Sequence, residues 1–184
     1  LVGSEMCIRD RHVALISNYL PVFTKLKGLE TTIAATGLTL IGIFNMMGTL
    51  ISGKISGIIK KKYVLSFIYF SRSIVIFFLL ILPTNNFVVI GFSCLIGLLW
   101  LSTVPPTSGI VANRFGTRYL STLFGIVMVS HQAGAFFGSF VGGLVIDAYG
   151  SLDLAWIMAI VISLFSAFIH LPIVEKEKSE EVFA

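Results

Sequence analysis

The sequence predicts an all-α membrane protein with six transmembrane helices. Of its 184 residues, 56% are hydrophobic and only 12% are charged, and the mean hydropathy is +0.96. Soluble domains average about 25% charged residues, so this deficit indicates an integral membrane protein. The net charge of +4 does not indicate nucleic-acid binding, because the few basic residues lie between apolar runs instead of forming a patch.

Apolar segments of spanning length follow one another along the chain. A helix needs about 20 apolar residues to cross a hydrocarbon core of about 30 Å. The first segment, residues 13–26, is shorter and is interpreted as a clipped helix. The second to sixth segments reach spanning length and are residues 31–55, 63–82, 87–112, 119–146 and 153–174.

The two ends of the chain are interpreted separately. Residues 1–11 read LVGSEMCIRDR, which back-translates without strain into a sequencing adapter with its transposon end. We therefore exclude them from the fold as an artefact and expect the native sequence to begin near His12, inside a longer coding sequence. What remains is a six-helix transmembrane unit, residues 12–174, and a charged tail, residues 175–184.

Basic residues gather on one side of the predicted up-and-down path. The connections are short and carry turn signals, so consecutive helices are expected to be antiparallel neighbours. The positive-inside rule then places the basic side and the C-terminal tail in the cytoplasm of a multi-pass protein of the cell membrane. The basic side holds Lys60, Lys61, Lys62, Arg114, Arg118, Lys176 and Lys178, and the other side holds Lys25, Lys27, Glu30, Asp147 and Asp153.

The fifth segment contains a tandem small-residue motif. In GAFFGSFVG, the residues Gly134, Gly138 and Gly142 recur every four positions and line one helical face. Such spacing lets a neighbouring backbone pack closely, so we expect a packing role. His131 lies on the same face and should therefore face the same neighbouring helix as the glycines.

Polar residues lie at the predicted middle of several spans. Polar groups at membrane depth are costly, and antiparallel spans bring their midpoints to one level, so these residues are candidates for a solute site. The alternative is interhelical hydrogen bonding worth about 1 kcal/mol per contact, and for Asn45 alone we favour it. The candidates are His131 and Gln132 in the fifth segment, Asn45 in the second, Trp100 and Ser102 in the fourth and Asn18 in the first.

The fourth segment should be kinked. Pro105 and Pro106 lack backbone N–H groups, which leaves the carbonyls of Leu101 and Ser102 without helical partners. Broken backbone at this depth is tolerated when it is buried in protein or lines a cavity, so the kink is a candidate gate.

Arg72 places a permanent charge in the middle of the third segment, SFIYFSRSIVIFFLLI. Its helical face is apolar, and its depth matches that of the two freed carbonyls on the adjacent span. We favour a structural role in which the guanidinium donates to these carbonyls. Binding of an anionic substrate and snorkelling to an interface remain alternatives.

The motifs of enzymes and metal sites do not occur in the sequence. No Asp or Glu lies well inside a predicted span, and there is no H-E-x-x-H, nucleophile elbow or phosphate loop. Cys7 and Cys94 match no disulfide framework or metal-ligand spacing. We therefore expect no enzymatic activity, no metal and no cofactor.

Three stretches together resemble the C-terminal six-helix half of a major facilitator superfamily (MFS) transporter. They are GLTLIGIFNMMGTLISGKISGIIKKKYVL, GLLWLSTVPPTSGIVANRFGTRYLSTLFGIVMVSHQAGAFFGSFVGG and DAYGSLDLAW. The chain is most similar to bacterial permeases of the monocarboxylate and oxalate carrier type. The resemblance implies two six-helix halves that rock around a midplane site, with this chain supplying the second half.

The resemblance also implies roles for particular segments. The first, second, fourth and fifth spans would line the central cavity, and the third and sixth would be peripheral. A cytoplasmic loop motif, G-x-x-x-D-R, would fall on residues 53–58. In this sequence Gly53 and the basic run Lys60, Lys61 and Lys62 remain, while Gly57 and Ile58 stand at the acidic and arginine positions.

The sequence thus predicts transport of a small organic solute, with a carboxylate as one candidate, by alternating access. The expected partners are the substrate, a coupling proton, the missing N-terminal half and the lipid bilayer, with no nucleic acid. A drug or sugar carrier of the same superfamily is the nearest alternative. A non-transporting six-helix scaffold or receptor subunit is the alternative of a different class.

Overall fold

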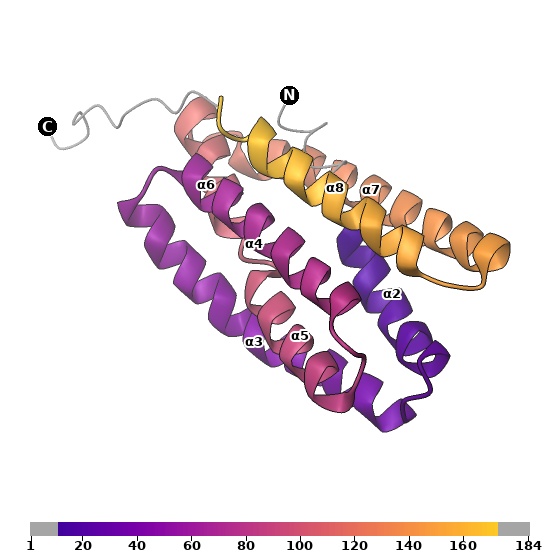
Figure 1. Ribbon diagram of the computed structural model, residues 1–184. Coiled ribbons are helices and arrows are strands. Elements are labelled where there is room, and N and C mark those ends of the chain that lie inside the picture. Colours follow the sequence, from indigo (N-terminus) through magenta and orange to yellow (C-terminus); the bar gives the residue numbers. More distant parts are fainter. Residues whose placement is uncertain (1–10, 173–184) are drawn as a thin grey trace, which may run out of the picture.

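The computed structural model describes residues 11–172, and all regular structure within this range is helical (Figure 1). The predicted artefact, apart from Arg11, and the predicted tail at residues 175–184 lie outside the described residues. The helices are α2 (Arg11–Leu26), α3 (Thr31–Ile58), α4 (Lys61–Ile81), α5 (Asn86–Leu99), α6 (Val104–Phe115), α7 (Leu120–Tyr149) and α8 (Asp153–Ile169).

Within the described residues, four helical stretches are long and apolar enough to cross a membrane. They are α3, α4, the combined stretch Asn86–Phe115 formed by α5 and α6, and α7. The helix α8 is apolar but has only 17 residues, and α2 has 16 residues with Pro21 inside it. The chain is therefore an all-helical membrane protein, and the number of six spans stays a prediction.

Turn residues end the helices where the sequence changes from apolar to polar. Gly150 follows α7 with a left-handed φ of 66°, and Gly116 follows α6 with a φ of 77°. Both conformations are costly for residues with a Cβ atom. At the start of α5, the side chain of Asn85 accepts a hydrogen bond of 2.9 Å from the backbone N–H of Val88.

The helices pack in a pattern of exchanged pairs. The main contacts join α2 to α7, α3 to α5 and α4 to α8. We count the stretch of α5 and α6 as one helix, so that α2, α3 and α4 form a first set of three and α5/α6, α7 and α8 a second set. If each helix of the first set is exchanged with the helix at the same position in the second set, the three pairs stay the same. Because consecutive helices alternate in direction, the chain has the arrangement of two three-helix units in inverted orientation.

An aromatic cluster fixes the end of the bundle where α8 begins. Trp156 of α8 is fully buried, and its ring meets Phe23 of α2 and Phe92 of α5 edge to face at centroid distances of 5.8 and 6.2 Å. These rings connect helices from both three-helix units.

The other end carries the lysine triplet. Lys62 Nζ donates to the carbonyl of Leu171 at 3.2 Å, and Ser66 Oγ donates to the carbonyl of Ala167 at 2.8 Å. These bonds join the start of α4 to the end of α8, as the predicted antiparallel path requires. The side of the membrane on which this basic end lies stays a prediction.

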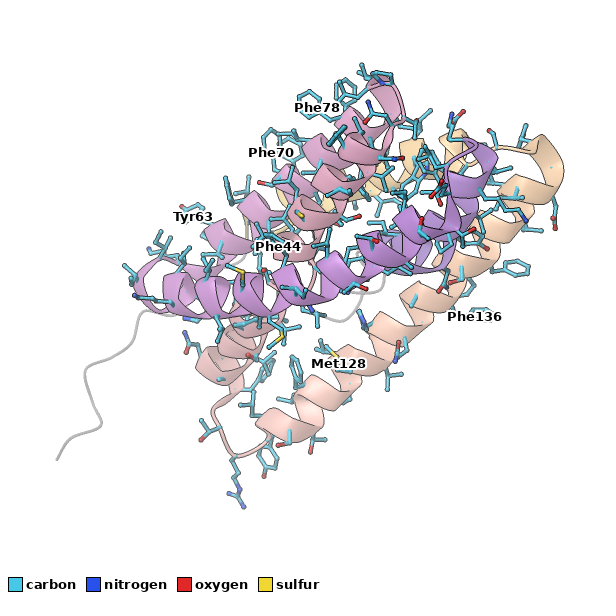
Figure 2. All side chains as sticks on the ribbon, turned by 90° about the horizontal axis from the view of Figure 1, so that it is seen from below. Phe44, Tyr63, Phe70, Phe78, Met128 and Phe136 are labelled. Carbon is cyan, nitrogen blue, oxygen red and sulfur yellow. The ribbon has the colours of Figure 1, made fainter. Side chains whose placement is uncertain are left out.

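Large apolar side chains cover much of the outer surface. Phe70 and Phe78 point away from the bundle along α4, and Phe136 points away along α7 (Figure 2). A soluble monomer rarely exposes such extended apolar surface, so the bundle is suited to contact with lipid or with other helices.

Candidate functional site

The predicted kink in the fourth segment is a complete break between two helices. The helix α5 ends at Leu99, α6 begins at Val104, and Pro105 lies in the first turn of α6. Proline is tolerated in a first turn because the N–H groups there have no intrahelical partner in any case. The backbone groups of residues 100–103 must therefore find partners outside a helical ladder.

Arg72 of α4 donates hydrogen bonds to two carbonyls at this break. Its Nε is 3.1 Å from the carbonyl oxygen of Leu99, and its terminal nitrogen Nη2 contacts the carbonyls of both Leu99 and Trp100. The side chain is only 1% exposed, and its guanidinium carbon lies 5.4 Å from the ring centroid of Tyr69. The charge is thus enclosed among peptide dipoles and an aromatic face.

The prediction that Arg72 meets the carbonyls of Leu101 and Ser102 was wrong by two residues. The Leu101 carbonyl instead accepts the N–H of Val104 at 2.9 Å, which closes a tight turn. The Ser102 carbonyl accepts the hydroxyl of Ser52 on α3. Because these partners satisfy the carbonyls that the prolines free, the guanidinium pairs with the last carbonyl of α5 and the one after it.

The helix α3 supplies the remaining partners of the break. Asn45 Oδ1 accepts the backbone N–H of Leu101 at 2.9 Å. Ser102 is buried, and its hydroxyl donates to the carbonyl of Leu98. Asn45 and Ser102 are therefore brought together, and their hydrogen bonds are interhelical or local instead of facing an open cavity.

A close approach of α3 and α5 brings these partners within reach. A Cβ atom on Gly48 would lie 1.9 Å from the carbonyl oxygen of Leu98, and one on Gly97 would lie 2.9 Å from the Cα of Ile41. This interface was not predicted from the sequence. Its signal is the spacing of Gly48, Ser52 and Ser56, which places a small residue at every fourth position.

The glycine face of α7 packs against α2. Gly134, Gly138 and Gly142 are all buried, and a Cβ on Gly142 would lie 2.5 Å from the ring of Tyr19. The Tyr19 hydroxyl donates to the carbonyl of Ser139 at 2.6 Å. At Gly142 the groove therefore receives an aromatic ring, where a neighbouring backbone was expected.

Three other predicted site residues, Asn18, His131 and Gln132, lie apart from the break. Asn18 Nδ2 donates to Ser139 Oγ at 2.7 Å, so it joins α2 to α7. His131 is partly buried on α7, and Gln132 beside it is exposed. Among the described helices α7 does not pack on α3, so His131 and Asn45 are not brought together. Trp100 packs against the main hydrophobic cluster.

A second group of buried polar residues lies between α4 and α8 and was not predicted. The ring of His170 stacks on Tyr69 at 5.0 Å, and its Nδ1 donates to the carbonyl of Ser166 at 2.5 Å. Ser163 is fully buried one turn before Ser166. The spacing of residues 163, 166 and 170 puts all three on one helical face, which was a readable signal.

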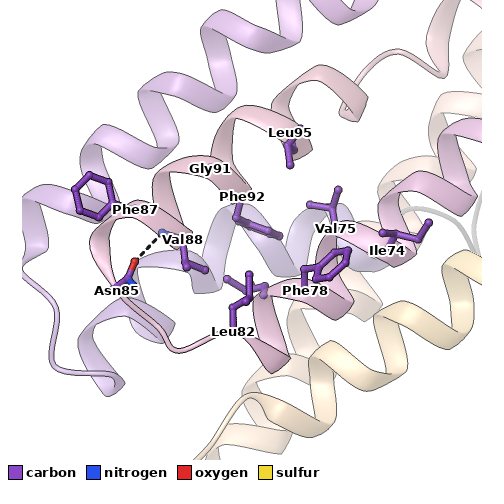
Figure 3. Close-up of a pocket in the computed structure, with 11 residues that line it drawn as sticks. Ile74, Val75, Phe78, Leu82, Asn85, Phe87, Val88, Gly91, Phe92 and Leu95 are labelled. Carbon is purple, nitrogen blue, oxygen red and sulfur yellow. Dashed lines mark hydrogen bonds between the residues drawn. The ribbon is translucent and has the colours of Figure 1, made fainter.

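Two open apolar grooves flank α4. The first, of about 510 Å³, lies between α4 and α5 and includes Val75, Phe78, Leu82, Asn85, Phe92 and Leu95 (Figure 3). We call it the neutral-end groove. The second, of about 500 Å³, lies between α3, α4 and α5 and includes Ile51, Ile55, Ile59, Tyr63, Phe67 and Ser102. We call it the basic-end groove. Of the predicted cavity residues, only Ser102 lines either groove.

The predicted cytoplasmic loop motif, residues 53–58, is not a loop: it forms the last turns of α3 and lies beside the start of α6. Gly53 is exposed, and a Cβ there would lie 3.7 Å from the side chain of Pro105. Lys61 packs its methylenes over Gly109 of α6. Among residues 11–172, no cluster of His, Cys, Asp and Glu side chains could hold a metal ion.

The chain is similar to a protein of Bacillus subtilis strain 168 described as an uncharacterised MFS-type transporter, YcxA. The two are 25% identical over 180 residues, which cover 95% of this chain. This similarity supports membership of the major facilitator superfamily. No protein-family model matches the chain. The chain spans 40% of the length of its relative.

This likeness and the apolar helices together indicate a multi-pass membrane protein that is similar along most of its length to an MFS-type transporter. The likeness to an uncharacterised relative carries no information on the substrate.

Proposed function

We propose that the chain forms the C-terminal six-helix half of a twelve-helix secondary transporter, which moves a small organic solute across the cell membrane by alternating access. The observation that carries this proposal is the similarity to an MFS-type transporter along 95% of the chain. The partner of the chain would be a further six-helix half of the same polypeptide. The basic end and the C-terminus of the present chain would lie in the cytoplasm.

Two features of the bundle support this proposal. The exchanged pairs of helices match the two inverted three-helix repeats from which each half of such a carrier is built. Backbone groups at the break between α5 and α6 pair with Arg72 of α4, with Asn45 and Ser52 of α3 and within the turn itself, as a discontinuous helix inside a membrane requires.

A small carboxylate is the substrate class that we propose first. It rests on the resemblance to monocarboxylate and oxalate carriers, and on the position of the carboxylates among the described residues. Glu30, Asp147 and Asp153 all lie at helix ends, so no described carboxylate in the middle of a span would repel an anion. Arg72 is not proposed as the anion site, because its fork is enclosed and donates to backbone carbonyls.

Uptake by the full-length protein would test this function. The full-length gene is expressed, the protein is reconstituted in proteoliposomes, and uptake of labelled lactate, oxalate, a hexose and a cationic drug is compared with empty liposomes. Saturable uptake of a carboxylate is expected. Uptake of the sugar or the drug alone would move the protein to the alternative carrier class, and absence of uptake with every solute would favour a scaffold.

A further inference from the structure

The two grooves beside α4 have similar size and apolar lining but differ in the charge near their mouths. The neutral-end groove opens beside the connection between α4 and α5, where residues 82–86 carry no charge. The basic-end groove opens beside the connection between α3 and α4. Two of its lining residues, Ile59 and Tyr63, directly flank the lysine triplet.

The basic end carries a net positive charge within the described residues. Lys60, Lys61 and Lys62 lie in the chain between Ile59 and Tyr63, which line the groove, and Arg114 and Arg118 belong to the same end of the bundle. The described carboxylates lie at the opposite end. Lys62 donates to the carbonyl of Leu171 after α8, and its ammonium lies 5.3 Å from the ring centroid of Tyr63, which lines the groove.

The length of the basic-end groove matches one leaflet of a bilayer. Along α3 its lining runs from Gly48 to Ile59. At 1.5 Å per residue this distance is about 16 Å, about half of a hydrocarbon core of about 30 Å. Apart from the buried Ser52 and Ser102, the side chains along it are mainly apolar, and Phe67 is 68% exposed. An acyl chain that lies in this groove would reach from the lysines to the break beside Leu99 and Ser102.

We propose that the basic-end groove is a binding site for one anionic phospholipid. An acyl chain fills the apolar lining, and the phosphate of the headgroup lies against the lysine triplet. Basic pockets between helices are suited to anionic headgroups, and each lysine near the surface strengthens the attraction by about fivefold in the binding constant. The neutral-end groove offers the same apolar surface without the charge, so it should accept acyl chains without selecting the headgroup.

Spin-labelled lipids in vesicles of phosphatidylcholine provide the test. The purified chain is reconstituted, and electron paramagnetic resonance compares how strongly it immobilises a trace of labelled phosphatidylglycerol and of labelled phosphatidylcholine. The chain should prefer phosphatidylglycerol. Replacement of all three lysines by glutamine should lower this preference by about fivefold for each lysine that contacts the headgroup, and added salt should lower it as well.

Matched variants separate the groove from the charge alone. Ile55→Trp fills the basic-end groove and should lower the preference, whereas Leu95→Trp in the neutral-end groove should leave it unchanged. Lys25→Gln with Lys27→Gln, at the other end of the bundle, should also leave it unchanged. Circular dichroism and size-exclusion chromatography verify that each variant is folded.

Three results would overturn the proposal. The first is equal immobilisation of both lipids by the unmodified chain. The second is that Ile55→Trp and Leu95→Trp lose the preference for phosphatidylglycerol equally, or that both keep it while the lysine variant loses it. In either case the groove would have no part in selecting the lipid. The third is an equal loss when Lys25 and Lys27 are replaced.

Discussion

At the scale of single residues, Arg72 shows how a permanent charge can be accommodated inside an apolar helix. Its planar fork donates to two successive carbonyls, at Leu99 and Trp100, and its side chain is buried. An isolated charge would be expensive at this depth, but peptide carbonyls at a helix end carry partial negative charge that offsets part of that cost. The arginine therefore stabilises the broken conformation of the helix.

Replacement of Arg72 should destabilise the fold. Arg72→Ala leaves two buried carbonyls without a donor, which should lower the free energy of unfolding by about 2–5 kcal/mol. Arg72→Lys should recover only part of this loss, because one ammonium cannot match the fork. The measurement is folded yield and thermal unfolding in detergent, with Arg118→Ala on the surface as the control. Unchanged unfolding temperatures in both Arg72 variants would contradict the structural role.

His131 allows a separate test of the cavity proposal. It shares the face of α7 that holds Gly134, Gly138 and Gly142, and that face packs on α2, so the glycines do not by themselves point toward a second half of the carrier. In the full-length protein with Cys94 and any other native cysteines replaced, we expect His131→Cys to react with a small hydrophilic thiol reagent. A transported solute should slow this reaction.

The control for this experiment is Phe136→Cys, on the exposed outer side of α7. In a bilayer it should not react with the hydrophilic reagent. Complete inertness of His131→Cys, with and without solute, would leave His131 with a packing role only.

How much of the candidate site the sequence could predict depends on the range of the interactions. The pairing of Arg72 with carbonyls near Pro105 followed from depth along antiparallel helices. The identity of those carbonyls did not, because the turn from Leu101 to Val104 and the hydroxyl of Ser52 had to be known first. These contacts depend on the three-dimensional approach of α3, which leaves no local pattern in the fourth segment.

At the scale of elements, the sequence located the helices from their apolar runs and turn residues. It missed the tightest interface, between α3 and α5, because its small residues are divided between glycine and serine. The close approach at Gly48 brings Asn45 and Ser52 within reach of the break. The conformation of one helix is thus held by the spacing of small residues on its neighbour.

Two glycines of α3 allow a matched test of this interface. Gly48→Ala would place a methyl group 1.9 Å from the carbonyl oxygen of Leu98, whereas a Cβ on Gly42 would meet nothing within 4 Å. We expect Gly48→Ala to lower the free energy of unfolding by about 1–3 kcal/mol through overpacking. Gly42→Ala should be neutral or slightly stabilising, because alanine is the better helix former. Equal stability of the two variants in a thermal unfolding assay would rule out the close approach.

At the scale of the whole molecule, the exchanged helix pairs and the likeness to an MFS-type transporter support the same interpretation. When the two three-helix units are exchanged, the pair of α2 and α7 becomes the pair of α3 and α5, and the pair of α4 and α8 stays the same. The sequence could suggest this arrangement only through the family resemblance, because hydropathy predicts the number and direction of spans but not which of them touch. The substrate could not be predicted, since the polar residues in the middle of the spans mainly serve helix contacts.

The central claim, that this chain is one half of a carrier, is tested most directly by expressing the two halves as separate chains. Solute uptake into cells is measured with this chain alone, with the remaining part of the full-length protein alone, and with both together. The account predicts uptake only when both are present, because a cavity between halves needs both. Uptake by this chain alone, or equal uptake with and without it, would contradict the account.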